Sequence, residues 1–304
     1  MLTHNKIIEI FCLADDFCKK ISQEIKKHQI APKNGKKHRK RSCEMSDSEI
    51  MTILLLFHYG TFKNFKHFYL HYIGIHLQGY FPKQLSYNRF VAVEHRVFVQ
   101  MMFFLNVVCF GKCTGITFID STKISVCHNK RIRRNKVFAG FAKTGKNTMG
   151  WFYGFKLHLL CNDKGELLSF CLTPANVDDR DPNTLKVLTK KLFGKLSGDK
   201  GYISSSLFET LFDNGVHLVT GMKNNMKNRL MSLYDKIMLR KRSVIETIND
   251  QLKNICEIEH SRHRAVHNFV MNLISALAAY CFFDKKPAIK FEMALPTGQT
   301  ALFE

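Results

Sequence analysis

Apolar residues recur at helical spacing through roughly the first hundred positions of the chain. Near its start, Ile7, Ile10, Ala14 and Cys18 fall on one face of a helix predicted over residues 1–30, with Lys, Glu and Asp at many of the positions between them. Apolar residues spaced by three or four positions are typical of a helix that packs one face on a core.

Two serines mark the starts of further helices. Ser46 is followed three residues later by Glu49, a capping box in which the two residues bond each other's backbone amides. Ser86 precedes another run with helical apolar spacing. We therefore predict an all-helical region over residues 1–112, interrupted at 31–41 by a segment rich in Pro, Asn, Gly, Lys and Arg.

The pattern changes after Gly115, where short apolar runs bounded by turn residues predict strands. These strands are expected over residues 116–120, 151–161, 166–173, 195–199 and 216–220. Helices are expected over residues 182–192, 204–212, 240–258 and 265–283.

The order of these elements predicts the fold class. Three successive strands, followed by alternating helices and strands, predict a mixed five-stranded sheet with flanking helices, the α/β architecture of the ribonuclease-H-like fold. In that fold the first and fourth strands are parallel neighbours. We assign it residues 113–284, preceded by the all-α region, and assign residues 285–304, with two prolines and no periodicity, to a tail.

The charge of the chain narrows the classes of partner. The formal net charge is +21 and the isoelectric point about 9.6, so the chain is attracted to polyanions. Nucleic acid is the commonest of these, an anionic membrane surface is the alternative, and composition alone also fits a ribosomal protein, a nuclease or a repressor. In this setting the helices of 1–112 suggest a helix-turn-helix-like DNA-binding region, with 31–41 as a phosphate-binding arm.

The cysteines and the apolar runs indicate the cellular compartment of the protein. The ten cysteines form no C-x-x-C pair, so neither a zinc ribbon nor a thioredoxin-like site is indicated, and buried thiols in a reducing compartment are expected. No secretory signal is visible, and the apolar run at 97–110 is shorter than the roughly 20 residues that span a bilayer. We expect a cytoplasmic, nucleoid-associated protein without a membrane partner.

Three carboxylates carry the candidate chemistry. Asp120 and Asp199 each end a predicted strand, and if those strands are parallel neighbours both side chains emerge at one edge of the sheet. A divalent cation relieves the repulsion between such carboxylates. Glu246 lies on the polar face of the predicted helix 240–258, four residues after Arg242. Taken singly, these are ordinary turn-capping acids and an ordinary i, i+4 ion pair; together they predict a metal-binding triad.

The spacing in this helix resembles that of a known family. Arg242, Glu246 and Lys253 reproduce the R-(3)-E-(6)-K signature of the DDE transposases encoded by bacterial insertion sequences. "FIDST" around Asp120 and "GDKGY" around Asp199 resemble the first and second Asp motifs of that family. The resemblance covers roughly residues 113–285, on the predicted strand, strand and helix.

Two features separate this chain from parts of that family. Leu239 stands where the signature often has Tyr, three positions before the Arg, which concerns the subgroup and the role of that tyrosine. Only 46 residues separate Asp199 from Glu246, which leaves no room for the large inserted domain of some relatives.

The resemblance implies an enzyme that cuts and joins DNA. Asp120, Asp199 and Glu246 would be the catalytic residues and would hold Mg²⁺ or Mn²⁺, as two ions, for hydrolysis at the ends of a mobile element and strand transfer by the freed 3′-hydroxyl. Arg242 and Lys253 would contact DNA phosphates. The partners would be double-stranded DNA, as terminal inverted repeats and target, and a second copy of the chain. The alternatives are an inactive or repurposed transposase that only binds DNA, and a ribonuclease-H-like structure-selective nuclease.

Further basic residues are candidates for DNA contact, although each is also compatible with solvated surface charge. Five of the seven residues from 130 to 136 are basic, one pair alternates with apolar residues on the second strand, and one group follows the fifth strand. The candidates are Lys130, Arg131, Arg133, Arg134, Lys136, Lys156, His158 and Lys223, with Lys227 and Arg229 beside the last.

Two further sets of residues receive structural interpretations. The clustered acids Asp178, Asp179 and Asp181 are interpreted as helix-capping and turn residues, despite their similarity to a metal-binding cluster. Trp151 could stack on a base, but we interpret it as a core anchor.

Overall fold

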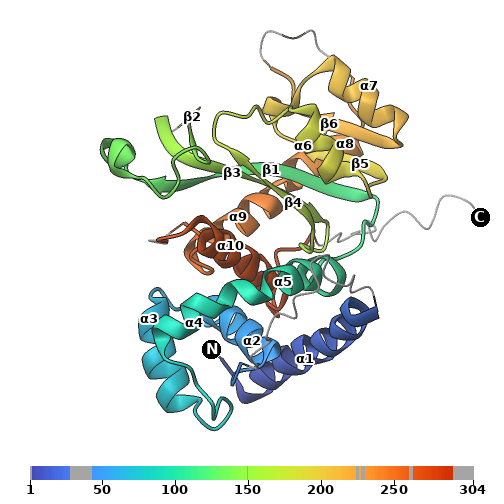
Figure 1. Ribbon diagram of the computed structural model, residues 1–304. Coiled ribbons are helices and arrows are strands. Elements are labelled where there is room, and N and C mark those ends of the chain that lie inside the picture. Colours follow the sequence, from blue (N-terminus) through green and yellow to red (C-terminus); the bar gives the residue numbers. More distant parts are fainter. Residues whose placement is uncertain are drawn as a thin grey trace, which may run out of the picture.

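The computed structural model describes residues 2–27, 43–148, 150–223, 226, 230–259 and 263–289. Helices form the N-terminal third of the chain, and a curled sheet with helices on both faces forms most of the rest (Figure 1). The predicted basic arm at 31–41 lies outside the described residues.

The described N-terminal part is helical, as predicted. Its elements are α1 (His4–Lys27), α2 (Asp47–Tyr59), α3 (Phe65–His67), η1 (Phe68–His76), α4 (Tyr87–Val93), η2 (Glu94–Val97), α5 (Phe98–Phe104) and η3 (Leu105–Cys109). The capping box at α2 is confirmed, because the Ser46 hydroxyl accepts from the Glu49 amide and the Glu49 carboxylate accepts from the Ser46 amide at 2.6 Å. Ser86 caps α4 as expected.

The helical segments from α4 to η3 follow one another without a break. The run Tyr87–Cys109 is therefore long and apolar enough to cross a membrane, judged by length and composition alone. Phe90, Met101 and Phe104 in this run are fully buried in the core. Only 33% of its apolar window is buried, however, and Val99, Phe103 and Val107 are more than half exposed.

The sheet has the predicted parallel pairing at its centre. Its strands are β1 (Ile116–Cys127), β2 (Lys143–Asn147), β3 (Gly150–Asn162), β4 (Leu167–Pro174), β5 (Gly194–Gly198) and β6 (Val216–Thr220). β1 pairs antiparallel with β3 and parallel with β5, and β6 is parallel to β5. The order β4-β3-β1-β5-β6 is that of the ribonuclease-H-like fold, and the predicted neighbours, the first and fourth strands, are confirmed.

The predicted count of five strands is wrong, because β2 adds a sixth. β2 pairs with the first five residues of β3, and β4 pairs with the remainder of the same edge. The sequence of β2, Lys-Thr-Gly-Lys-Asn, contains no apolar residue. An edge strand without a buried face leaves no alternating apolar pattern to detect.

Helices cover both faces of the sheet. They are α6 (Pro182–Thr189), α7 (Ser205–Asp213), α8 (Leu233–Lys241), α9 (Ser243–Asn254) and α10 (Val266–Cys281), with the short turns η4 (Asn129–Arg134) and η5 (Lys200–Tyr202). The prediction of one helix over 240–258 is wrong, because the chain turns at Arg242 between α8 and α9. The two helices serve different strands: α8 contacts β5 and β6, whereas α9 contacts β1 and β3.

One continuous core joins the N-terminal helices to one face of the sheet. It contains Ile10 of α1, Leu55 of α2, Phe118 of β1 and Leu277 of α10, and α10 packs directly against α2. Figure 1 shows α10 and α9 between the sheet and the N-terminal helices. The predicted division at residue 112 therefore does not separate two cores. On the other sheet face, α6 and α7 enclose a second, smaller core.

The predicted tail begins as an ordered segment. The Ile289 amide donates to the Asp163 carbonyl at 2.8 Å, so the chain after α10 lies against the β3–β4 turn. The remainder of 285–304, from residue 290, lies outside the described residues.

Candidate active site

Asp120 and Asp199 lie just beyond the parallel pairing of β1 and β5. The prediction that Asp120 ends its strand is wrong, because β1 continues to Cys127. Phe118 of β1 pairs with Ser197 of β5, and each Asp stands two residues further along its chain. Because side chains alternate between the faces of a sheet, both carboxylates project to the face that carries α9 and α10. Asp199 also caps η5, accepting from the Gly201 amide at 2.8 Å.

Helix α9 brings Glu246 to this edge. Its apolar stripe, Ile245, Ile248 and Leu252, is fully buried, which turns the opposite polar face towards Asp120 of β1. Two side chains of that polar region reach Asp120. Arg242 Nη1 lies 3.4 Å from Asp120 Oδ1, and the amide of Asn249 donates to Asp120 Oδ2 at 2.8 Å.

Arg242 links two of the three carboxylates. One of its terminal nitrogens pairs with Asp120 and the other bonds the Glu246 carboxylate one helical turn away. Its side chain is only 21% exposed, so this guanidinium neutralises the acids from within the site.

The three carboxylates also affect one another electrostatically. The pKa of Asp120 is raised to about 6, first because burial disfavours its charged form and then because Asp199 and Glu246 repel it. The Arg242 guanidinium opposes this rise. An additional cation at the edge would lower the free energy of the ionised triad, which is the electrostatic condition for a metal site.

The donor chemistry fits a hard divalent cation. Three carboxylates converge on one edge, and the Oδ1 atom of Asn249 is buried without a hydrogen-bond partner among the described residues. The spacing is wider than in a formed site: across the part of the chain that the structure describes, no three His, Cys, Asp or Glu side chains are close enough to hold one metal ion. Arg242 occupies the bridging position between Asp120 and Glu246.

Lys253, the third member of the signature, lies one turn beyond Asn249 and is paired with an acid. Its Nζ lies 3.4 Å from Glu259 Oε2, and another oxygen of Glu259 accepts from the Ser125 amide of β1 at 3.2 Å. This contact ties the end of α9 to the carboxyl-terminal part of β1.

The predicted cationic cluster after β1 is exposed. It belongs to η4 and the residue that follows Asn135, and consists of Lys130, Arg131, Arg133, Arg134 and Lys136. Within the described ranges none of these side chains pairs with an acid, so their charges face solvent. Lys223 is exposed as well, whereas Lys227 and Arg229 lie outside the described residues.

The expectation that Lys156 and His158 line the site is wrong. Both project to the sheet face opposite Asp120, because Asp120 pairs with Leu159, whose neighbours on β3 point the other way. His158 is fully buried with Nε2 2.9 Å from the Thr173 hydroxyl, and burial lowers its pKa. Lys156 Nζ lies 3.0 Å from Asp179 Oδ1 and donates to the Val177 carbonyl, so neither side chain is free to contact DNA.

The clustered acids of the following loop have the predicted structural roles. Asp181 caps α6 by accepting from the Thr184 amide at 2.8 Å. Asp178 accepts from the backbone and guanidinium of Arg180, which holds its pKa well below the usual range. These acids lie with Lys156 on the opposite face from Asp120 and take no part in the triad.

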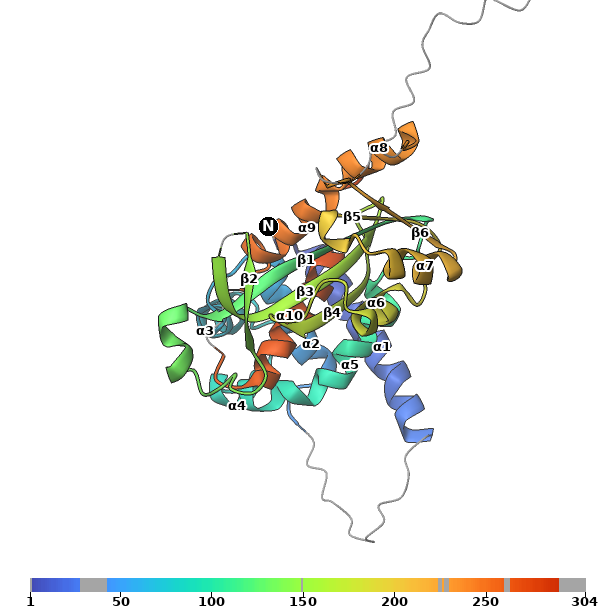
Figure 2. The same ribbon diagram turned by 90° about the horizontal axis from the view of Figure 1, so that it is seen from above.

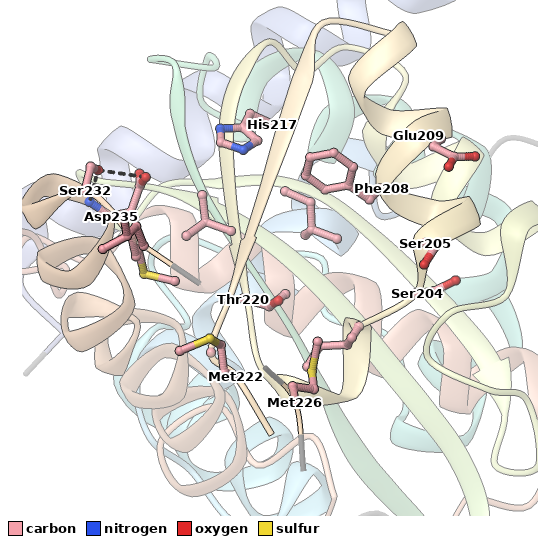
Figure 3. A pocket seen from close by; sticks show the side chains of 16 residues that line it. Ser204, Ser205, Phe208, Glu209, His217, Thr220, Met222, Met226, Ser232 and Asp235 are labelled. Carbon is pink, nitrogen blue, oxygen red and sulfur yellow. Dashed lines mark hydrogen bonds between the residues drawn. The ribbon is translucent and has the colours of Figure 1, made fainter. Parts of the chain in front are cut away.

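One pocket of the described structure lies away from the triad. It is a half-open cavity of about 470 Å³ between α7, β6 and the start of α8, and none of the three carboxylates lines it (Figure 3). Figure 3 shows His217, Phe208 and Thr220 around it, with Asp235 held by Ser232.

Asn249 is the site residue that the sequence reasoning did not single out. It stands seven residues after Arg242, a spacing that returns it to the same helix face, and its contact with Asp120 follows from that position. Figure 2, viewed from above, shows α9 running alongside β1.

Comparisons with known proteins agree with this geometry. A family model described as "Transposase DDE domain" matches residues 110–266, which include all three carboxylates. Among solved structures, the chain matches the crystal structure of the Mos1 strand transfer complex at 11% identity, with 86% of this chain and 67% of that chain covered and a TM-score of 0.22. At this TM-score the match adds nothing to the strand order described above. The curated proteins give no match.

Proposed function

Since the chain belongs to the transposase DDE domain family, we propose that it is a DNA transposase that hydrolyses a DNA strand at each end of its mobile element and transfers the freed 3′-hydroxyl to target DNA. The observation that supports this proposal is the juxtaposition of Asp120 and Asp199 on neighbouring parallel strands, with Glu246 joined to Asp120 through Arg242. Asp120, Asp199 and Glu246 are the proposed catalytic residues.

Transposase DDE domains use divalent metal ions, and we propose Mg²⁺, replaceable by Mn²⁺, as the ion held by the triad. Two such ions, when bound, would activate the attacking water or 3′-hydroxyl and stabilise the leaving oxygen. The role of Asn249 is to position one oxygen of Asp120 by its amide, while the other oxygen faces Arg242. Burial of the apolar side of α9 holds Glu246 at a fixed depth against β1.

Arg242 has two successive partners in this proposal. Without metal, it neutralises Asp120 and Glu246. If those acids carried metal, the guanidinium would be available to a DNA phosphate beside the cut, and Lys253 would provide a second contact along α9 by exchanging Glu259 for a phosphate. The exposed cations of η4 and Lys223 extend the phosphate contacts away from the edge. Because both ends of an element must be cut together, the DNA complex contains two copies of the chain.

The test is strand cleavage of duplex DNA that carries the element's own ends, with Mg²⁺ or Mn²⁺. Asp120→Asn preserves the shape of the side chain and removes its charge, and is expected to abolish cleavage while DNA binding persists. Asp178→Asn is the matched control, because Asp178 is an exposed acid on the other sheet face. The proposal fails if both variants cleave, or if both lose activity equally.

A second candidate function is DNA binding without catalysis. It is favoured by the position of Arg242 between Asp120 and Glu246, and by the lack, within the described residues, of any three His, Cys, Asp or Glu side chains close enough to hold one metal ion. Binding of the element's ends with no cleavage by the folded wild-type protein would establish it. Cleavage of branched DNA regardless of sequence would instead indicate a structure-selective nuclease, as would the absence of inverted repeats and short target duplications around the reading frame.

A further inference from the structure

Trp151, the only tryptophan of the chain, is exposed to solvent. It is the second residue of β3 and 62% of its surface is accessible, so its interpretation as a core anchor is wrong. Lys146 pairs with it across the β2–β3 ladder, and the Lys146 ammonium lies 5.8 Å from the centre of the indole ring. A large aromatic ring left in water beside a cation is a common feature of binding surfaces.

The backbone that carries the indole ring is held in place by neighbouring residues. Asn129, at the start of η4, donates to the Trp151 carbonyl at 2.7 Å and ties the η4 turn to β3. The next residues on the same side of β3, Tyr153 and Phe155, are buried, and Phe155 stacks on Phe269 of α10. Trp151 is therefore the exposed end of a row of aromatic side chains whose inner members belong to the core.

The surroundings of this ring are strongly cationic. Residues 121–155 contain eight Lys and Arg and no Asp or Glu. Phe141, just before β2, is 58% exposed and adds a second aromatic ring to this part of the surface. Figure 1 shows η4 and β2 projecting together beyond the end of α9 and α10. Exposed aromatic rings among unpaired cations are the arrangement by which proteins hold single-stranded nucleic acid, since the cations follow the phosphates and the rings stack on bases.

The position of Trp151 relative to the triad can be worked out along β3. Asp120 pairs with Leu159, and Trp151 lies eight residues earlier on the same side of the strand. At about 3.3 Å per residue the separation is about 26 Å, which corresponds to about eight nucleotides at about 3.4 Å each. The sheet face between them is covered by α10, on which Phe155 stacks, so a strand that leaves the triad passes over the surface and needs at least about eight nucleotides to reach the indole.

A fully paired duplex cannot contact both the cations and the indole ring of this surface. Its base faces are covered by stacking, so it can engage the cations but leaves the indole in water. A strand with unpaired bases can engage both. We propose that Trp151, Lys146 and the η4 cations form a binding site for an unpaired stretch of DNA, one base stacking on the indole at least about eight nucleotides from the cleaved phosphate. The assignment of that DNA as the reacting strand rests on the transposase function proposed above.

Intrinsic fluorescence tests the site directly, because all tryptophan emission comes from Trp151. The full-length protein is titrated in EDTA, so that no cleavage occurs, with a 20-nucleotide single strand, the same strand paired over half its length, and the full duplex. Stacking predicts quenching by the first two DNAs and little quenching by the duplex. Trp151→Ala is expected to weaken binding of the first two, measured by anisotropy of labelled DNA, by roughly 5- to 150-fold, with duplex affinity unchanged.

Two further variants separate stacking from general effects. Trp151→Phe keeps an aromatic ring and is expected to retain most of the affinity for unpaired DNA. Phe212→Ala removes an equally exposed ring, 62% accessible on α7, and is expected to change no affinity. Equal losses of duplex and single-strand binding in Trp151→Ala, or emission unaffected by any DNA, would overturn the proposal. Tighter binding of RNA of the same sequence would overturn the assignment to DNA.

These outcomes are independent of catalysis. Quenching in EDTA by a protein that never cleaves with Mg²⁺ would leave the stacking site in place and refute the proposed transposase function. Cleavage by a protein whose emission does not respond to unpaired DNA would do the reverse.

Discussion

The buried charge of Asp120 is expected to reduce the stability of the metal-free protein. Its pKa is raised from 3.8 to about 6, and its side chain is only 21% exposed. At about 1.4 kcal/mol per pKa unit, the ionised carboxylate costs about 3 kcal/mol of folding free energy. Because the folded-state pKa is the higher one, this cost is nearly absent below pH 3.8, grows between pH 3.8 and about 6, and is complete at neutral pH.

Asp120→Asn removes the charge and keeps the volume. In EDTA at pH 7.5 we expect the variant to unfold on the order of 5–10 °C above the wild type, since about 1 kcal/mol moves the Tm of a protein of this size by about 2–4 °C. The difference is expected to shrink towards zero near pH 4. Circular dichroism at both pH values measures it.

A control of opposite sign is available in the same protein. The pKa of Asp178 is lowered by Arg180, so Asp178→Asn is expected to leave the Tm at pH 7.5 unchanged or slightly lower. Added Mg²⁺ is expected to raise the Tm of the wild type more than that of Asp120→Asn. A wild type as stable as Asp120→Asn in EDTA at pH 7.5 would refute the reasoning, because it would show that the carboxylate is not buried at an energetic cost.

Three further predictions concern stability and DNA contact. His58 is buried, with Nδ1 2.7 Å from the Cys256 carbonyl and a pKa lowered to about 4. The stability that depends on neutral His58 is therefore lost as the pH falls from 6.5 to about 4. His58→Gln should make the free energy of unfolding, measured by urea titration, fall less over this pH range. Ser46→Ala removes the cap of α2 and should cost about 1 kcal/mol in the same titrations, whereas an unchanged midpoint would show the capping box to be dispensable. Arg131→Gln and Arg133→Gln, on exposed η4, should each lower the salt dependence of duplex binding by about one unit of slope; equal slopes would place DNA elsewhere.

Most of the fold could be predicted because its elements carry strong periodic signals. The strands at the sheet centre are apolar and bounded by turns, and Pro182 and Ser204 mark helix starts. β2 could not be predicted, since an exposed edge strand needs no apolar residue. The break at Arg242 was hidden because the residues on both sides of it favour helix, and the direction of each helix depends on the strand it packs against.

The positions of site residues were predictable where strand order determines them, and unpredictable where they depend on which sheet faces are buried. Asp120 and Asp199 meet because parallel strands share a carboxyl edge, which element order alone indicates. The prediction that His158 lines the site was wrong because the alternation of residues along a strand shows which ones share a face. It does not show that α6 and its preceding loop cover that face. The prediction that Trp151 is buried was wrong for the converse reason. Apolar residues are usually buried, but nothing in the sequence shows that β3 extends beyond the core.

The packing of α10 against α2 affects how the chain can fold during its synthesis on the ribosome. α2 is among the first elements synthesised, and ten of its thirteen residues are buried in a core that α10 helps to complete. N-terminal segments usually fold as they emerge, but here the early helices lack their partner until the chain has been made past Cys281. A nascent chain halted before α10 would expose the apolar surface of α2, so the N-terminal helices and the sheet should reach their final packing together, once α10 has been made.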